Sequence, residues 1–334
     1  MEGMRAVCRI SVNNTKWCTG VLLNTPDLTP EPYILTVAHC IGSQNEASKS
    51  IFYFNYESPE CDGPDGSINH SISGSQLIAT GDTLGDNLNR DSLDFSLVKL
   101  TVTPPDSFSV FLAGWNRDTT AASQTASIHH PHGDVKKISF DYDKPVTSYH
   151  TPNYYPDYVD FSHWRIIQWD LATTEMGSSG APLFDQNKRV VGILTGGEAR
   201  CVSSVDDYYT KIDYAWDYYT SPLKHLKTWL DPTNSGVIAI DGRDFINSAE
   251  DYQQEQVQIY PNPGSGRYLI NPGQPFQGTI LINVFSLAGE IIFTDKILHP
   301  GLYELNLNNH TPGLYIVRLI FPDRIYTAKI ILQP

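Results

Sequence analysis

The sequence has no apolar run long enough to cross a membrane. A membrane-spanning helix needs roughly 18 or more consecutive apolar residues, and every apolar run in this chain of 334 residues is far shorter. The first residues, MEGMRAVCRI, also lack the basic stretch followed by an apolar stretch that marks a secretory signal peptide. The sequence therefore predicts no transmembrane segment, and its amino terminus shows no route of export.

Positive charge is scarce as well. Lysine and arginine number 23 against 37 aspartates and glutamates, which gives a formal net charge of −14. Because an acidic chain is repelled by phosphate-rich polymers and anionic lipids, we expect no nucleic-acid partner and no anionic membrane surface as a partner. A cationic substrate is compatible with this charge. Hydrophobic residues make up 40% of the chain, which excludes a disordered protein and allows one large domain with a smaller second one.

Sulfur-containing residues are few. The chain has five cysteines at scattered positions and three methionines, a usage typical of proteins from an oxidising compartment. Because no export signal is visible, we expect the chain to be a fragment of a longer precursor. At least one cysteine would then have its partner upstream of Met1.

Residues 5 to about 229 consist of short apolar runs separated by polar, glycine and proline clusters. Runs this short, and this rich in β-branched and aromatic residues, predict strands rather than helices; they are 21–23, 33–37, 51–56, 95–100, 110–113 and 190–194. Residues 221–230 instead begin with Ser-Pro and place apolar residues at helical spacing. The region is therefore predicted to be an all-β sandwich or barrel that ends in one helix.

The composition changes after this region. Residues 247–256 are almost entirely polar, as in a linker. Beyond them acidic and basic residues nearly balance, and strand-like runs alternate with turns at 278–285, 290–293, 302–307, 314–321 and 325–332. We therefore predict a domain at 1–246, truncated at its amino-terminal side, a linker at 247–256 and a small β-sandwich at 257–334.

Three segments in the first domain carry groups that activate a nucleophile. They are LTVAHC, which contains His39, LDFS, which contains Asp94, and GSSGAP, which contains Ser179. A serine hydroxyl becomes an effective nucleophile when a histidine takes its proton, and a carboxylate fixes the tautomer of that histidine. Taken singly, the residues have plain alternatives as a loop serine, a structural histidine and a strand-capping aspartate. Their order and their position beside strand-like runs predict a catalytic triad.

These segments resemble the trypsin and chymotrypsin family, whose histidine precedes a cysteine and whose serine lies in G-x-S-G-G-P. The runs CTGVL (18–22), GILTGG (192–197) and YTKI (209–212) resemble further strands of that family. Within it, the runs AGWNR (113–117), IHHP (128–131) and TE (174–175) resemble bacterial lysyl endopeptidase. The resemblance spans about residues 5–243 and implies a trypsin-like double β-barrel.

The resemblance also implies a mechanism. Ser179 would attack the scissile carbonyl, His39 would act as general base and then general acid, and Asp94 would orient His39. The N–H groups of Gly177 and Ser179 would form the oxyanion hole, worth about 3 kcal/mol per donor. It further implies a disulfide between Cys18 and Cys40.

This chemistry calls for no cofactor and no metal. The pair His129-His130, with His132 nearby, suggests metal ligands only at first sight. No acidic or cysteine ligand stands at a recognised spacing from these histidines. We expect a structural role for them.

The substrate pocket departs from trypsin. Thr173 stands where trypsin has its pocket aspartate, whereas Asp207 stands where lysyl endopeptidase has one. A carboxylate there would favour a P1 ammonium or guanidinium group. The alternative is that residues 206–208 form a polar turn.

The choice between lysine and arginine is left open. Thr195 occupies the position of a histidine that lysyl endopeptidase uses, and Gly196 and Gly197 complete the strand that would pair with substrate. The tryptophan of that family has no clear match in the aromatic-rich insert at 149–161.

Two further departures concern activation and disulfides. Ser178 replaces the aspartate with which trypsin pairs its new amino terminus, so we expect control by removal of a propeptide instead. Cys201 matches a family cysteine whose usual partner is missing. Its partner is Cys8, Cys61 or a residue upstream of the chain.

The carboxy-terminal segment resembles the sorting domain of the Por (type IX) secretion system, through IYPNP (259–263), VFSLAGE (284–290), PGLYIV (312–317) and KI (329–330). The resemblance implies the type IX machinery as a partner. It also implies passage through the periplasm of a Bacteroidota-type bacterium to the cell surface or the medium. A generic β-sandwich binding module is the alternative.

The sequence as a whole predicts a secreted serine endopeptidase that acts on proteins or peptides after lysine, with arginine left open. A glutamyl-endopeptidase-like enzyme would need a cationic group or a histidine in the pocket rather than Asp207. A non-catalytic surface binding protein would be expected to lack a member of the triad, and none is lacking.

Overall fold

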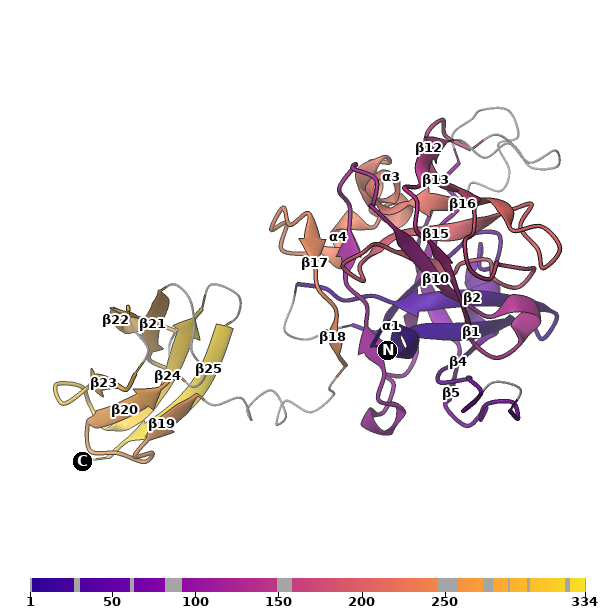
Figure 1. Ribbon diagram of the computed structural model, residues 1–334. Coiled ribbons are helices and arrows are strands. Elements are labelled where there is room, and N and C mark those ends of the chain that lie inside the picture. Colours follow the sequence, from indigo (N-terminus) through magenta and orange to yellow (C-terminus); the bar gives the residue numbers. More distant parts are fainter. Residues whose placement is uncertain are drawn as a thin grey trace. The chain divides into compact units, whose positions relative to one another are not determined.

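The computed structural model describes residues 2–26, 31–60, 63–81, 92–148, 158–245, 257–272, 279–287, 289–298, 301–321 and 325–333. The chain divides into two compact units, Met1–Asn247 and Ser248–Pro334 (Figure 1). The predicted linker, Cys61 and most of the insert at 149–161 lie outside the described residues. Within the described ranges, no helix is long and apolar enough to cross a membrane.

The first half-barrel is a seven-stranded antiparallel sheet in the order β5-β4-β1-β2-β3-β7-β6. Its strands are β1 (Val7–Val12), β2 (Lys16–Leu22), β3 (Tyr33–Thr36), β4 (Ser50–Tyr53), β5 (Ser71–Ser73), β6 (Ser75–Thr80) and β7 (Ser96–Leu100). The sheet packs tightly at Gly20, where a Cβ atom would lie 2.7 Å from Ile34 and 2.8 Å from Ile10. Only glycine fits there without displacing the core.

The second half-barrel is a nine-stranded sheet. Its main path runs β11-β10-β14-β15-β16-β13-β12, with β9 and β17 attached beside β15. The strands are β9 (Trp115–Asn116), β10 (Thr125–His129), β11 (Lys137–Asp141), β12 (Val146–Ser148), β13 (His163–Gln168), β14 (Pro182–Phe184), β15 (Val190–Gly197), β16 (Val205–Lys211) and β17 (Ala239–Ile240). A separate ribbon pairs β8 (Phe111–Leu112) with β18 (Arg243–Asp244). The predicted all-β double barrel is confirmed.

Helices are short in this unit. They are α1 (Glu2–Ala6), α2 (Gln44–Ser48), α3 (Ile212–Asp217) and α4 (Lys227–Leu230), with 3-10 turns at Asp106–Phe108, Pro131–Gly133 and Pro222–Lys224. The single helix predicted at 221–230 is wrong in detail, because His225 is extended (φ −148°, ψ 160°) and separates a 3-10 turn from α4. Its ring bonds the Tyr219 carbonyl at 2.8 Å and the Thr228 hydroxyl at 2.7 Å, and these contacts oppose a continuous helix.

The second unit is a small β-sandwich, as predicted. One sheet has the order β19-β20-β23 and the other β22-β21-β24-β25. The strands are β19 (Gln258–Tyr260), β20 (Arg267–Asn271), β21 (Ile280–Phe285), β22 (Ile291–Ile297), β23 (Tyr303–Asn306), β24 (Gly313–Ile320) and β25 (Ile325–Leu332). Alternate residues of β21, namely Ile280, Ile282 and Val284, are buried in one core, which is the period-2 pattern of a strand with one covered face.

Candidate active site

His39 and Asp94 lie together at the ends of neighbouring strands. His39 follows β3, Asp94 precedes β7, and these strands pair through Thr36 and Ser96. The Nδ1 atom of His39 lies 2.8 Å from Oδ2 of Asp94, and the backbone N–H of His39 donates to Oδ1 at 3.1 Å. The structure thus brings together two of the three predicted triad residues. Because Nδ1 faces the carboxylate, Nε2 lies on the opposite side of the ring, and in a catalytic triad that nitrogen exchanges the proton with the nucleophile.

Asp94 is suited to remain ionised although it is 1% exposed. Burial alone would raise its pKa, but the charge of His39 and two hydrogen bonds from it outweigh burial and lower the pKa below the usual value. A buried anion at this position stabilises the imidazolium that forms when His39 accepts a proton.

Ser179 lies in a tight loop between two glycines. Gly177 has φ +90° and Gly180 has φ +85°, a region that residues with side chains rarely adopt. At Gly180 a Cβ atom would lie 2.2 Å from the carbonyl oxygen of Thr19. The loop is therefore pressed against β2, and the Ser179 carbonyl accepts a hydrogen bond from the Thr19 N–H at 2.8 Å.

The disulfide implied by the resemblance is present, between Cys18 and Cys40. Cys40 directly follows His39, and Cys18 directly precedes Thr19, the residue that holds the serine loop. The bond therefore ties the histidine turn to the strand on which the serine loop rests. This connection places all three predicted catalytic residues in one region of the fold.

The loop before Ser179 carries the two backbone N–H groups that were predicted to form an oxyanion hole. The carbonyl of Met176 accepts a hydrogen bond from the His132 N–H at 2.5 Å, and the hydroxyl of Thr19 donates to the carbonyl of Gly177 at 3.1 Å. Because a peptide is planar, fixing the Met176 carbonyl turns the Gly177 N–H to the opposite side. In the part of the chain that the structure describes, neither the Gly177 nor the Ser179 N–H donates to a protein acceptor. These two donors are the predicted oxyanion-binding pair.

A neutral histidine lies under the serine loop. The Nδ1 atom of His129 lies 2.8 Å from the Ser178 hydroxyl, and its Nε2 atom lies 3.1 Å from the Ser139 hydroxyl. Burial, with a smaller contribution from the charge of Lys137, lowers the pKa of His129 to about 4. Ser178, at the position of trypsin's activation aspartate, is therefore held by an uncharged partner. Both ring nitrogens of His129 are engaged with protein hydroxyls, which fits the expected structural role.

Asp207 lies inside β16, where it pairs with Ile166 and Gly197. This position excludes the polar-turn alternative. The side chain is buried, and its Oδ2 atom accepts hydrogen bonds from the indole N–H of Trp169 at 2.7 Å and the Thr174 hydroxyl at 2.6 Å. Burial raises the pKa of Asp207 to about 6, although the hydrogen bonds from Thr174 and Trp169 lower it. Above pH 6 the site is a buried anion with neutral donors.

Of the other predicted substrate-binding residues, Gly197 lies directly beside this carboxylate. Gly196 (φ +154°) and Gly197 end β15, and a Cβ atom on Gly197 would lie 2.6 Å from Oδ1 of Asp207. The Thr173 hydroxyl is buried and has no hydrogen-bond partner within the described ranges. Thr195 instead belongs to a different group of side chains, because its hydroxyl bonds that of Thr210 at 2.8 Å and lies 3.3 Å from Nε2 of His163.

Three residues near the site were not predicted. One is His163 of β13, whose Nε2 atom lies 3.3 Å from the Thr195 hydroxyl. The charge of His163 also contributes to the lowered pKa of Asp94. The roles of Trp169 and of the Thr19 hydroxyl were missed as well, since no local motif marks them.

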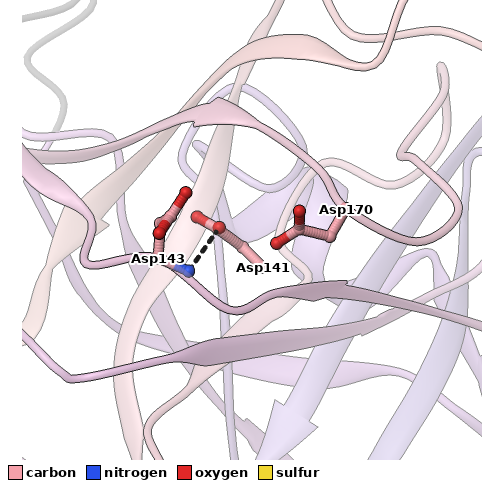
Figure 2. A group of neighbouring side chains, drawn as sticks. All are labelled: Asp141, Asp143 and Asp170. Carbon is pink, nitrogen blue, oxygen red and sulfur yellow. Dashed lines mark hydrogen bonds between the residues drawn. The ribbon is translucent and has the colours of Figure 1, made fainter.

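Two other features lie away from the triad. A cavity of about 1200 Å³ is lined on one side by Thr173 and Cys201 and on another by Lys136, and its lining does not include the triad. Figure 2 shows Asp141, Asp143 and Asp170, whose carboxylate oxygens lie within 4.8 Å of one another. Asp141 accepts a hydrogen bond from the Asp143 N–H at 2.9 Å, and Asp170 accepts one from the Tyr142 N–H at 2.7 Å, so these carboxylates hold the turn after β11.

The raised pKa of Asp207 predicts a stability effect. The folded protein binds this proton more tightly than the unfolded chain, so the group's contribution to the free energy of unfolding falls between about pH 4 and pH 6 and stays low above. Asp207→Asn changes the free energy of unfolding by some amount at each pH. We expect that change to be more favourable at pH 8 than at pH 4, by up to about 3 kcal/mol. Denaturant unfolding at both pH values measures this.

The neighbouring Asp206→Asn variant is the control, because Asp206 is an accessible partner of Arg165 and should change stability by less than about 1 kcal/mol. An Asp207→Asn protein that is less stable than the wild type at pH 8 by the same amount as at pH 4 would contradict the assignment.

Both units of the chain resemble known proteins. Residues 258–333 match the family model of the secretion system C-terminal sorting domain, which marks the chain for secretion. Lysyl endopeptidase of Pseudomonas aeruginosa is 31% identical over 201 residues, covering 58% of this chain and 40% of that protein. The matched region thus spans about two fifths of the length of that curated relative.

Two solved structures are similar in part. A Glu endopeptidase in complex with MPD has a TM-score of 0.39 and 16% identity over 62% of this chain and 85% of that chain. The MamO protease domain of Magnetospirillum magneticum has a TM-score of 0.42 and 12% identity over 66% and 98%. The family model of the lysyl endopeptidase C-terminal domain matches residues 2–210, more than half of the chain. The chain therefore belongs to the lysyl endopeptidase C-terminal domain family.

Proposed function

We propose that this chain is a serine endopeptidase that cleaves peptide bonds after basic residues, with His39, Asp94 and Ser179 as its catalytic triad. The observation that carries the proposal is the 2.8 Å contact between His39 Nδ1 and the buried, ionised Asp94. In this proposal residues 1–246 form the catalytic domain, 247–256 the linker and 257–334 the sorting domain.

The reaction follows from the roles of the groups. Nε2 of His39 takes the hydroxyl proton as Ser179 attacks the scissile carbonyl, and Asp94 stabilises the imidazolium. The N–H groups of Gly177 and Ser179 hold the developing oxyanion. His39 then gives its proton to the leaving amine, and an acyl-enzyme remains. A water molecule repeats the sequence with His39 as base, which releases the new carboxyl end and restores Ser179.

The charge of the pocket supports a basic P1 residue. Asp207 is a buried carboxylate whose hydrogen-bond donors, among the described residues, are the neutral groups of Trp169 and Thr174. A cationic substrate side chain would neutralise its charge. The same carboxylate would repel a P1 glutamate, which disfavours a glutamyl-endopeptidase-like preference. The N–H groups of Gly177 and Ser179 and the His39–Asp94 pair are groups that catalysis needs and binding alone does not. They disfavour a non-catalytic binding protein.

The sorting domain supports the type IX secretion machinery as the partner that exports the chain. The substrates would then be proteins or peptides met at the cell surface or in the medium.

Loss of the triad should abolish turnover without loss of the fold. We expect Ser179→Ala to lower kcat/KM on a lysine substrate by roughly 10⁴- to 10⁶-fold and Asp94→Asn by roughly 10⁴-fold. Steady-state kinetics measure both. Asp217→Asn, which removes a surface partner of Lys227, is the matched control and should stay near the wild-type rate. A Ser179→Ala protein that cleaves at the wild-type rate would end the assignment.

The P1 preference can be read from a peptide library cleaved by the intact chain and sequenced by mass spectrometry. We expect lysine, with or without arginine, before the cleaved bond, and weaker cleavage after these basic residues in Asp207→Asn. A wild-type preference for P1 glutamate or phenylalanine would rule out Asp207 as the pocket residue.

Deletion of residues 257–334 should stop the protein from reaching the outside of a cell that has a type IX system. We expect the shortened protein to accumulate inside the cell and to retain peptidase activity, because its core is separate from that of the tail. Fractionation and immunoblotting measure this. Unchanged secretion would favour the alternative of a generic binding module.

A further inference from the structure

The two carboxylate oxygens of Asp207 differ in the hydrogen bonds that they accept. Oδ2 accepts one hydrogen bond from Trp169 Nε1 at 2.7 Å and a second from Thr174 Oγ1 at 2.6 Å. A carboxylate oxygen offers about two lone-pair sites. The accepting capacity of Oδ2 is therefore filled before any substrate arrives.

Oδ1 is in a different position. No hydrogen bond to it is found within the described parts of the chain. It lies beside Gly197, where a Cβ atom would come within 2.6 Å of it. A glycine at this point of β15 keeps the space next to Oδ1 open, on the strand that the resemblance assigns to substrate pairing.

Neither donor to Oδ2 has room to turn away. Trp169 is 2% exposed, its ring packs edge-on against Tyr209 with centroids 6.3 Å apart, and its backbone N–H donates to the Ser204 carbonyl at 2.8 Å. Thr174 is also 2% exposed and lies on the segment that leads to Ser179. The rigidity of both residues keeps Oδ2 occupied.

We propose that Trp169 and Thr174 are specificity-determining residues that favour lysine over arginine at P1, because they leave Asp207 a single accepting oxygen. This inference rests on the proposed function of the same site. It assigns the discrimination between the two basic residues to the donors behind the carboxylate.

The chemistry of the two substrates differs at this point. A guanidinium group binds a carboxylate through two parallel N–H···O bonds that need both oxygens. Because Oδ2 already accepts two hydrogen bonds, one of the two guanidinium N–H groups would be buried in the pocket without an acceptor. A buried donor without an acceptor is unfavourable. A lysine ammonium is a compact charge with three rotatable donors, and one carboxylate oxygen is sufficient for it.

The donors also affect ionisation. Burial raises the pKa of Asp207 to about 6, and the hydrogen bonds from Thr174 and Trp169 oppose that rise. Removing a donor would therefore free Oδ2 and raise the pKa further. The comparison must be made at about pH 9, where the carboxylate is ionised in every variant.

The test compares kcat/KM of the intact chain on two peptides that differ only in lysine or arginine at P1. We expect the wild type to favour lysine by tenfold or more. Thr174→Val, which removes only a hydroxyl, and Trp169→Phe, which removes the indole N–H, should each narrow this ratio about tenfold. The change should appear in KM for the arginine peptide rather than in its kcat.

Trp164→Phe is the matched control, since Trp164 belongs to the same buried cluster and makes no hydrogen bond to Asp207 within the described residues. Its ratio of kcat/KM for the lysine peptide to kcat/KM for the arginine peptide should equal that of the wild type. A wild type that cleaves both peptides equally, or an unchanged ratio in a folded Thr174→Val protein, would overturn the inference.

Failure of the proposed function has a different signature. It would appear as no cleavage of either peptide, or as cleavage that persists in Ser179→Ala. In that case the relative affinities of butylammonium and butylguanidinium, measured by NMR titration of the wild type and Thr174→Val, still decide the inference. A preference for the ammonium that narrows about tenfold in the variant supports it, and equal affinities in both proteins contradict it.

Discussion

The N–H of Thr19 donates to the Ser179 carbonyl at 2.8 Å, and its hydroxyl donates to the Gly177 carbonyl and accepts from the His130 N–H, each at 3.1 Å. Thr19 is fully buried on β2, in the first half-barrel, whereas these partners belong to the second. The neighbouring Cys18 is bonded to Cys40, beside the predicted base. One residue therefore sets the position of the nucleophile loop relative to the histidine turn, and the proposed chemistry depends on that alignment.

The pKa values of the two buried carboxylates are shifted in opposite directions because their surroundings differ. Asp94 faces His39, whose charge and hydrogen bonds lower its pKa despite burial. Asp207 has only the neutral donors Trp169 and Thr174, and burial raises its pKa to about 6. The first carboxylate is paired with His39 and, in the proposed mechanism, serves the acid–base step. The second lacks a cation within the described residues, so a basic substrate side chain is the partner that would stabilise it.

The strands and the triad segments were predictable because each depends on local pattern: short β-branched runs, or a motif beside such a run. The features that were not predictable depend on contacts across the barrel. The Trp169 bond to Asp207 joins residues 38 positions apart, and the Thr19 bond to Gly177 joins residues 158 positions apart. The helix predicted at 221–230 is shortened to α4 for a different reason: His225 makes side-chain contacts with residues six and three positions away, and these compete with a continuous helix. Apolar periodicity does not register such contacts.

The central claim, that Ser179 is a nucleophile activated by His39 and Asp94 next to a pocket for basic side chains, is tested most directly by covalent labelling. The intact chain would be treated with a lysine-derived diphenyl phosphonate and mapped by peptide mass spectrometry. The account predicts one adduct per chain, located on Ser179. An unlabelled chain, or a label on the adjacent buried Ser178 or on any other residue, would contradict it.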